Sequence, residues 1–258
     1  MLDPDEITTN LKTKRIGKKV LVYHSTSSTS DVAAEYARSR ENDGLVVFAE
    51  EQRAGRGRAG TKWDSGKGDS ILCSIVLAGD PLPSHLLSLA SAVAVAEAIG
   101  SVGTASHARI KWPNDILLNG RKVAGILLES RTDRQGSVCI LGIGINCHQH
   151  PNSFSEELRP TATSLDIESR STIDRVSLAR RLLSCVDHWL EVARRDSDKV
   201  IEKWSKLSIQ LGRRTTLIFN GVRFSGHCIG IDPEKGLILR LDAGGIRMFD
   251  AAHTTIAK

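Results

Sequence analysis

The amino-acid sequence predicts an α+β fold in which a large mixed part is followed by a small all-β part. Two observations support this fold class. Short apolar strands alternate with helical stretches up to about residue 210, and beyond Gly212 four short strands follow one another with tight turns between them. We therefore expect two domains, residues 1–210 and residues 211–258, and the second domain is expected to be a small β-barrel.

The first 210 residues contain the alternating elements. We expect strands over residues 20–23, 45–49, 70–77, 123–128 and 138–146, and helices near residues 32–37, 86–99, 173–190 and 199–207. Hydroxyl residues should cap these helices: Ser84 the second, and Thr172 or Ser171 the third. Residues 1–15 and 148–171 are polar, so the former should be loosely ordered and the latter loop-like. Trp189 and Trp204 should lie in the core.

One turn is defined by its residues. Asn119–Gly120 lies between the apolar runs 116–118 and 123–128, which is typical of a type I′ β-hairpin. Lys122 follows that turn directly.

The composition is that of an ordinary globular protein with a weak preference for anionic partners. The chain has 258 residues, a net charge of +5 and 40% hydrophobic residues. Five cysteines without C-x-x-C spacing predict reduced core residues rather than a disulfide framework or zinc site. No apolar run is long enough to span a membrane, and the polar start is unlike a signal peptide. We therefore expect a cytoplasmic protein.

The stretch from Gln52 to Trp63 reads Q-R-A-G-R-G-R-A-G-T-K-W. Its glycines favour an irregular loop, and its arginines offer planar donors suited to phosphate or carboxylate oxygens. Such a loop should be mobile when empty and close on a polyanion. An exposed basic turn, or an RNA-binding tract of the Arg-Gly type, would have the same composition. The residues that carry this pattern are Arg53, Gly55, Arg56, Gly57, Arg58, Gly60 and Lys62.

Three further segments carry polar or glycine patterns. Residues 24–31, H-S-T-S-S-T-S-D, place hydroxyls at a helix start, for capping or for a small ligand. K-W-P-N-D places Lys111 near Asp115, as a surface salt pair or as a site for phosphate and magnesium. Glycines at 125, 142 and 144 leave a slot on one face of the sheet, which a ligand or a bulky neighbour could fill.

Taken in order, these motifs resemble those of biotin–protein ligases. G-R-G-R-x-G, K-W-P-N-D, K-x-A-G-I-L and G-x-G-I-N occur in this sequence, and the resemblance covers about residues 20–258. It implies a mixed-sheet catalytic domain of the biotin/lipoate ligase type with a C-terminal SH3-like barrel. It also implies ATP and Mg²⁺, with biotin first activated to biotinyl-5′-AMP and then transferred to a lysine of a biotin carboxyl carrier domain of a biotin-dependent carboxylase.

The resemblance assigns roles to particular residues. Lys122 and Arg58 are the expected electrostatic catalysts, and Asp115 is the expected magnesium ligand. Biotin is expected to contact Ser28, Thr29, Ser30, Gln52, Gly55, Arg56, Gly57, Arg58, Lys122, Gly125, Gly142 and Gly144. ATP is expected to contact Arg58, Trp63, Lys111, Asn114, Asp115, Lys122 and Asn146.

This sequence departs from the family pattern in three places. Thr61 stands where some relatives have another loop arginine, and Ser30 stands where asparagine is common. About 20 residues precede the first strand, which is too few for the helix-turn-helix of members that also repress transcription, so no DNA binding is expected. The family includes both monomers and homodimers.

Competing hypotheses remain at this point. A lipoate–protein ligase shares the adenylation chemistry, but the Gly-Arg loop and the terminal barrel favour biotin. A basic nucleic-acid-binding protein would use Arg53, Arg56, Arg58 and Lys62, but leaves the segment 111–115 and the glycine slot without a role. A sensor that binds biotin without catalysis would have no use for Lys122 and Asp115.

Overall fold

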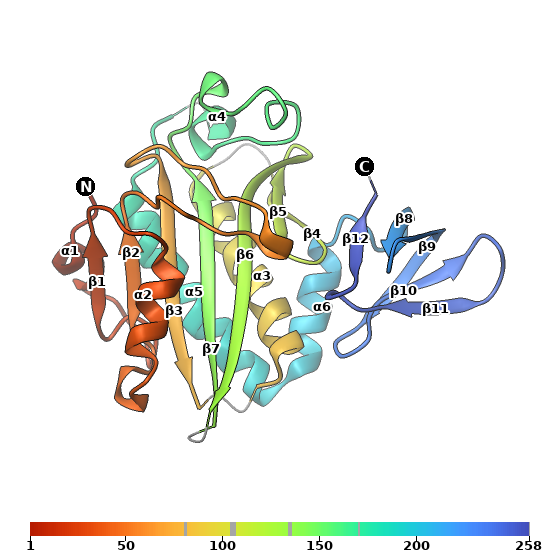
Figure 1. Ribbon diagram of the computed structural model, residues 1–258, viewed down its shortest axis with the longest axis horizontal. Helices are drawn as coiled ribbons and strands as arrows, with labels where there is room; N and C mark the ends of the chain where they lie inside the picture. The colour runs from red at the N-terminus through yellow and green to blue at the C-terminus, as the bar shows by residue number, and fades with distance from the viewer. Residues whose placement is uncertain (80–81, 104–106, 134–135, 170, 258) are drawn as a thin grey trace.

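The computed structural model describes residues 1–79, 82–103, 107–133, 136–169 and 171–257 (Figure 1). Its strands form one mixed sheet of seven and one antiparallel sheet of five, which confirms the predicted α+β class. The strands of the larger sheet are β1 Val20–Tyr23, β2 Val46–Ala49, β3 Ser70–Ala78, β4 Arg109–Lys111, β5 Asp115–Leu118, β6 Arg121–Asp133 and β7 Gly136–Asn146.

The register of the larger sheet aligns the glycines that the sequence singles out. The strand order is β1-β2-β3-β7-β6-β5-β4, and among the described residues of these strands only β1 and β2 pair in parallel. Asp115 pairs with Gly125, and Gly125 pairs with Gly144. Two residues further along β6, Leu127 pairs with Gly142 of β7, and Gly142 pairs in turn with Ser74 of β3. Because cross-strand partners face the same side, these residues share one face of the sheet.

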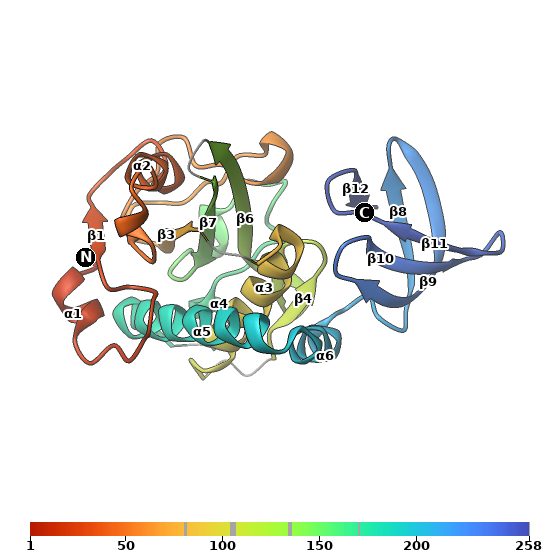
Figure 2. The ribbon, with the colours of Figure 1, turned by 90° about the horizontal axis from the view of Figure 1, so that it is seen from below.

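Helices cover both faces of this sheet (Figure 2). α3 Ser84–Gly100, α5 Arg175–Arg195 and α6 Ser197–Leu207 pack on one face over the main apolar core. α2 Thr29–Tyr36 covers part of the opposite face above a smaller cluster that contains Ala33, Val47, Val76 and Ile140. The loop 52–63 therefore covers the part of that face that α2 does not cover.

The helix boundaries differ slightly from those expected. α2 begins at Thr29 with Ser28 as its cap, whereas Pro83 rather than Ser84 precedes α3, and Asp174 caps α5. Asp174 is a better acceptor for a free backbone N–H than the hydroxyls two and three residues earlier, because its carboxylate is charged. Short helices α1 Pro4–Thr8 and α4 Leu165–Ser169 and three 3₁₀ turns, at Arg40–Asn42, Arg58–Gly60 and Pro151–Ser153, complete the described elements.

Several local predictions are confirmed. Asn119 and Gly120 have φ of 48° and 78°, as a type I′ turn requires. All five cysteines are free and buried. Trp189 and Trp204 are 8% and 0% exposed. Among the described residues, no helix combines the length and apolar character needed to cross a membrane.

The C-terminal sheet is open rather than closed. It contains β8 Arg214–Phe219, β9 Val222–Asp232, β10 Gly236–Leu241, β11 Ile246–Phe249 and β12 Thr254–Ile256, in the order β11-β10-β9-β8-β12. In the part of the chain that the structure describes, no ladder joins β11 to β12, so the expected SH3-like barrel is not formed by hydrogen bonds. The fifth strand, β12, has only three residues, which is too short a pattern to recognise in the sequence.

The expectation that residues 1–15 are loosely ordered is wrong. Leu2 and Ile7 are 1% and 0% exposed, so a few apolar side chains are enough to hold this polar segment on the core. The Leu2 backbone N–H donates to Glu50 Oε1 at 2.6 Å, and Arg175 Nη2 lies 2.8 Å from Glu50 Oε2. Glu50 thus joins the N-terminal segment and α5 to the strand end from which the loop 52–63 departs.

We predict that Glu50 makes stability fall in acid. Burial raises the pKa of Glu50, but the Leu2 N–H and Arg175 outweigh it and hold the pKa below its usual 4.5. The stabilisation is therefore present above about pH 4.5 and is lost as the pH falls through the lowered value. Glu50→Gln should cost roughly 3 kcal/mol at neutral pH, since Arg175 loses its charged partner.

The measurement is the free energy of unfolding in urea between pH 3 and pH 7. Between pH 4.5 and pH 3 the wild type should lose more stability than Glu50→Gln. Equal losses over that range would show that this pair does not set the acid response.

Candidate functional site

A cavity of about 240 Å³ lies between the larger sheet, the start of α2 and the loop 52–63. It brings together most of the residues that the sequence predicts for ligand binding, although they come from five separate segments. Those lining it are Ser28, Thr29, Ser30, Gln52, Arg56, Gly57, Arg58, Trp63, Asn114, Asp115, Lys122, Gly125, Gly142 and Gly144.

Three predicted residues are not in this lining. Asn146 is 5% exposed and its amide donates to the Thr163 carbonyl at 3.0 Å. Gly55 lies behind the lining, where its carbonyl accepts from the Trp63 N–H at 3.0 Å. Lys111 pairs with Asp115 in the β4–β5 ladder.

The structure adds lining residues that sequence reasoning missed. They are strand residues beside the slot glycines, namely Cys73, Ser74, Ile126, Leu127 and Ile143; the loop residues Thr61 and Lys62 also line the cavity. Ser74 could have been found only through its register with Gly142, because a serine inside an apolar strand carries no signal of its own. Strand register depends on tertiary pairing and is not visible in one strand.

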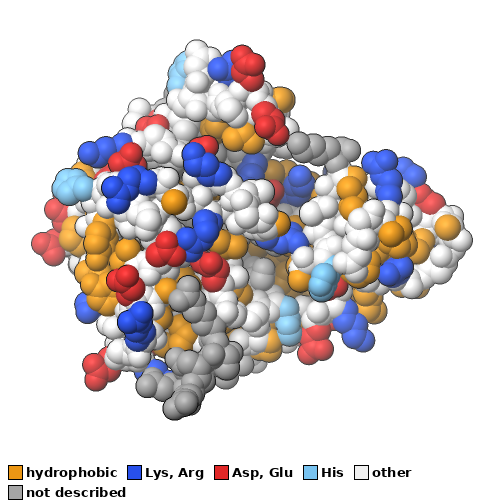
Figure 3. Space-filling view, viewed as in Figure 1, with side chains coloured by type: hydrophobic (Ala, Val, Ile, Leu, Met, Phe, Trp, Pro, Cys, Tyr) orange, Lys and Arg blue, Asp and Glu red, His pale blue; other side chains and the backbone are white. Residues whose placement is uncertain are grey.

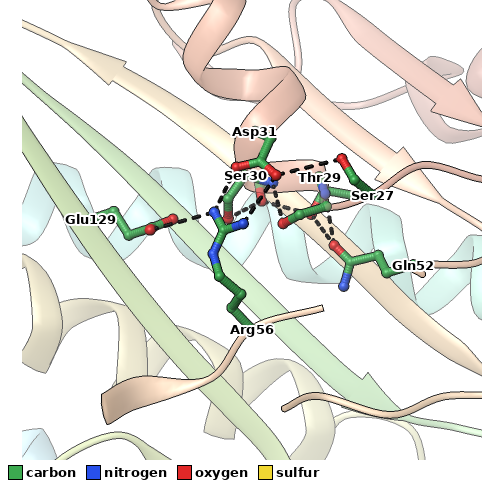
Figure 4. A network of polar contacts seen from close by, with 9 residues as sticks. Ser27, Thr29, Ser30, Asp31, Gln52, Arg56 and Glu129 are labelled. Carbon is green, nitrogen blue, oxygen red and sulfur yellow. Dashed lines mark hydrogen bonds and ion pairs between the residues drawn. The ribbon is translucent and has the colours of Figure 1, made fainter. Parts of the chain in front are cut away.

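One end of the cavity is a cluster of hydroxyls and an amide. Gln52 Oε1 accepts from the Thr29 N–H at 2.7 Å and from Thr29 Oγ1 at 2.9 Å (Figure 4). Ser74 Oγ lies 2.8 Å from Thr29 Oγ1 and 3.1 Å from Ser30 Oγ. Hydroxyls both donate and accept, so this end suits a neutral ligand group that has N–H donors and a carbonyl.

The Trp63 indole fills much of the glycine slot. A Cβ built on Gly144 would lie 2.5 Å from Trp63 Cε2, and one on Gly125 would lie 2.9 Å from Cζ3. The bulky-neighbour explanation of these two glycines is therefore confirmed. Gly142 differs, because its Cβ would meet Ser30 Oγ at 3.2 Å. Gly125 and Gly144 therefore make space for the Trp63 ring at one end of the cavity, and Gly142 makes space for Ser30 at the other.

The loop itself has a defined path. Arg56 and Lys62 form an antiparallel bridge, and the Gly57 N–H donates to the Thr61 carbonyl at 2.7 Å. The tip is a 3₁₀ turn, Arg58–Gly60, in which Ala59 has φ of 54° and Gly60 of 74°. This small hairpin returns the chain so that Trp63 faces the sheet.

The other end of the cavity is cationic. Lys122 Nζ lies 2.6 Å from Asp115 Oδ1 and 5.5 Å from the Trp63 ring centroid. The Arg58 guanidinium donates to the carbonyls of Ala251 and Thr254 in the C-terminal sheet, the latter at 2.8 Å. Burial lowers the pKa of Arg58. Figure 3 shows basic side chains gathered in the hollow between the two sheets.

Arg56 is held away from this cationic end. Its guanidinium binds Asp31 of α2 through two hydrogen bonds and lies near Glu129 of β6 (Figure 4). The hydrogen bond to Asp31, followed by the charges of Glu129 and Asp31, raises the pKa of Arg56 despite its partial burial.

The described residues offer no protein-only metal cage. They contain no group of three or more histidine, cysteine, aspartate or glutamate side chains placed to share an ion. Asp115 supplies the carboxylate in the cavity lining that the structure describes. A single carboxylate suits magnesium that arrives with phosphate oxygens and retains water ligands.

The fold and the cavity define an α+β domain for a ligand with a neutral polar end and an anionic end. Residues 22–146 match the model of the Biotin/lipoate A/B protein ligase family. The bifunctional ligase/repressor BirA of Bacillus subtilis is 36% identical over 258 residues, covering 97% of this chain and 78% of that protein. The biotin–[acetyl-CoA-carboxylase] ligase of Paracoccus denitrificans is 34% identical over 227 residues, covering 85% and 93%.

A solved structure shares the fold as well. The biotin protein ligase from Aquifex aeolicus in complex with biotin and ATP has a TM-score of 0.80 and 24% identity, covering 93% of this chain and 99% of that one. The chain belongs to the Biotin/lipoate A/B protein ligase family. The Paracoccus denitrificans relative is named as a biotin ligase and the Bacillus subtilis relative as a ligase and repressor.

We predict that a methyl group at Gly144 will expel the Trp63 indole from the slot. Gly144→Ala places Cβ within 2.6 Å of two ring carbons, and overpacking of this kind costs about 1–3 kcal/mol unless the loop moves. Amide hydrogen exchange at Trp63 should therefore become faster while the strands of the sheet stay protected.

The control removes the other partner of the clash. In a Trp63→Ala background, Gly144→Ala should change loop exchange little, because no ring is present to be displaced. An equal increase in exchange in both backgrounds would show that Gly144→Ala disturbs the β7 strand and does not act by displacing the ring.

Proposed function

We propose that this protein is an ATP-dependent biotin–protein ligase. It activates biotin to biotinyl-5′-AMP and transfers the biotinyl group to one lysine of a biotin carboxyl carrier domain. The observation that carries the proposal is a single cavity whose hydroxyl end and cationic end are joined across a glycine floor. The relatives named as biotin ligases support this function over lipoate ligation.

In the first step the biotin carboxylate attacks the α-phosphorus of ATP. A carboxylate oxygen–phosphorus bond forms, and the bond from phosphorus to the bridging oxygen breaks, so pyrophosphate leaves with both electrons. Both reactants are anions, and charge grows on the phosphate oxygens in the transition state. Lys122 and Arg58 supply positive charge at this end of the cavity.

Lys122 must exchange partners during this step. It is held by Asp115 at 2.6 Å, and its backbone N–H donates to the Thr161 carbonyl at 2.7 Å, so the side chain starts from a fixed position. An arriving phosphate competes with Asp115 for the ammonium. The released carboxylate is then free to hold magnesium, which enters as the MgATP substrate.

In the second step the lysine amine of the carrier domain attacks the carbonyl carbon of the mixed anhydride. An amide bond forms, AMP leaves with the bonding electrons, and the amine loses a proton. The anhydride also reacts with water, so the loop 52–63 and the Trp63 ring protect it by covering the cavity.

The hydroxyl end orients the ureido ring of biotin. That ring has two N–H donors and one carbonyl acceptor, which match Thr29, Ser74 and the Gln52 amide. Gly142 lines the cavity beside Ser30, and a side chain there would crowd Ser30 Oγ at 3.2 Å. The nucleotide then occupies the Lys122 and Trp63 end.

The test mixes protein, MgATP, equal amounts of biotin and lipoate, and a carrier domain, and measures the mass added to one lysine. Lys122→Ala should release pyrophosphate at least about tenfold more slowly, a barrier increase of at least about 1.4 kcal/mol. Lys18→Ala, at an exposed lysine, is the matched control. No mass addition by the wild type, or addition of lipoate instead, would refute the proposed function. A wild-type rate in Lys122→Ala would remove its assigned role.

We predict that Arg58→Gly will release the adenylate. The substitution removes a half-buried cation and both contacts to the C-terminal sheet, so the loop should cover the intermediate less well. Adenylate formation should slow, and escaped biotinyl-5′-AMP should label lysines of a bystander protein, detected by mass spectrometry.

Loop coverage is measured in the same proteins by trypsin. Cleavage at Arg56 of Arg58→Gly should be faster than in the wild type, and biotin with ATP should slow it less. Unchanged cleavage together with no bystander labelling would show that the loop does not cover the adenylate.

A further inference from the structure

Arg56, which lines the cavity, links the loop 52–63 to α2 and to β6. Its Nη1 and Nη2 donate to the two carboxylate oxygens of Asp31 at 3.0 and 2.7 Å, and Nη2 lies 3.6 Å from Glu129 Oε1. Figure 4 shows the guanidinium between these carboxylates, which come from α2 and from β6. Neither acid is among the site residues that the family resemblance assigns, although Asp31 ends the polar segment 24–31.

We propose that Asp31 and Glu129 form a carboxylate clamp that holds the loop 52–63 closed through Arg56. In this arrangement Arg56 and its two partners are positioning residues for the adenylation reaction, which rests on the proposed function. The clamp replaces the direct biotin contact that the family resemblance predicts for the Arg56 side chain.

Charge argues against a direct ligand contact. Asp31 and Glu129 together carry two negative charges against the single positive charge of Arg56. The trio therefore carries a net charge of −1, which repels a ligand carboxylate or phosphate, whereas the pair of Lys122 and Asp115 is neutral. A guanidinium that forms a bidentate pair with a carboxylate is also fixed in orientation. Such a side chain is better suited to holding a loop in place than to moving toward a ligand.

The position of the clamp argues for loop closure. Asp31 lies in the first turn of α2, directly after Thr29 and Ser30 of the hydroxyl end. Glu129 lies on β6 on the same face as Gly125, because the two are four residues apart in one strand. Arg56 precedes Gly57, whose N–H closes the loop hairpin. Closing the clamp therefore places the hairpin across the cavity, with Trp63 over the sheet.

The clamp is weak enough to open. The side chains of Arg56, Asp31 and Glu129 are 38%, 42% and 32% exposed, so each ion pair changes the opening equilibrium by only about two- to fivefold. A reversible closure is what the reaction needs, because biotin and ATP must enter before the cavity is covered.

The primary test is hydrogen exchange of the loop in the ligand-free full chain. The double variant Asp31→Asn with Glu129→Gln should speed exchange of the Gly57 and Trp63 amides by roughly three- to tenfold. Arg56→Gln should do the same, and combining all three should add little, since one clamp is lost in each case. Raising the salt concentration should speed loop exchange in the wild type and not in the variants.

A matched control removes a helix charge outside the clamp. Asp31 also lies where a carboxylate stabilises a helix N-terminus, so part of its effect could come from α2. Glu35→Gln removes an exposed acid from the same helix and should leave loop exchange unchanged. Exchange of the α2 amides in Asp31→Asn reports any fraying of the helix separately.

The second readout is kinetic. Loss of the clamp should raise KM for biotin several-fold while the rate at saturating biotin changes little, and Arg56→Lys should recover only part of the loss. Additive effects of Arg56→Gln and the double variant, or unchanged loop exchange in either, would overturn the clamp. Failure of the wild type to form adenylate would refute the proposed function, whereas the exchange result would still decide the clamp.

Discussion

The contact between the Trp63 indole and the glycines of β6 and β7 determines how the site is built. A side chain at Gly125 or Gly144 would overlap the ring, so the loop could not approach the sheet. The indole Nε1 is buried and has no hydrogen-bond partner among the described residues, which costs free energy that packing must offset. A ligand group able to accept from that nitrogen would remove the cost. The same contact that holds the loop on the sheet therefore favours a polar ligand group beside the indole.

The charged groups of the site are already paired before any ligand arrives. Arg56 binds two carboxylates, Lys122 binds Asp115, and Arg58 binds backbone carbonyls. Pairing keeps buried or half-buried cations from losing their solvation without compensation. The consequence of pairing differs between the three cations, because Asp115 and the carbonyls lie at the cationic end of the cavity whereas Asp31 and Glu129 do not. Exchange of partners is thus expected for Lys122 and Arg58, and persistence of the pair for Arg56.

Local signals in the sequence predicted most elements, and the resemblance predicted most of the cavity lining. The alternating apolar runs and the Asn119–Gly120 turn depend on neighbouring residues alone, so they could be read directly. Ser74 and Glu129 could not, because their places depend on strand pairing across the sheet. The buried N-terminal segment was missed because Leu2 and Ile7 are too few to form a pattern. Asn146 belongs to the G-x-G-I-N motif, but its side-chain amide donates to the Thr163 carbonyl. That contact depends on the fold and is not visible in the sequence.

The Arg58 contacts also give the C-terminal sheet a part in the site. Backbone carbonyls of Ala251 and Thr254 lie at a turn between β11 and β12, and the turn is fixed by Asp250, which accepts from the His253 N–H at 3.0 Å. Carbonyls cannot be lost by substitution, so the position of Arg58 depends on the path of this turn rather than on one side chain. Because the guanidinium also lines the cavity, any ligand that draws it inward must weaken a contact between the two sheets. Arg58 is thus a residue through which a ligand that displaced it would change the packing of the C-terminal sheet.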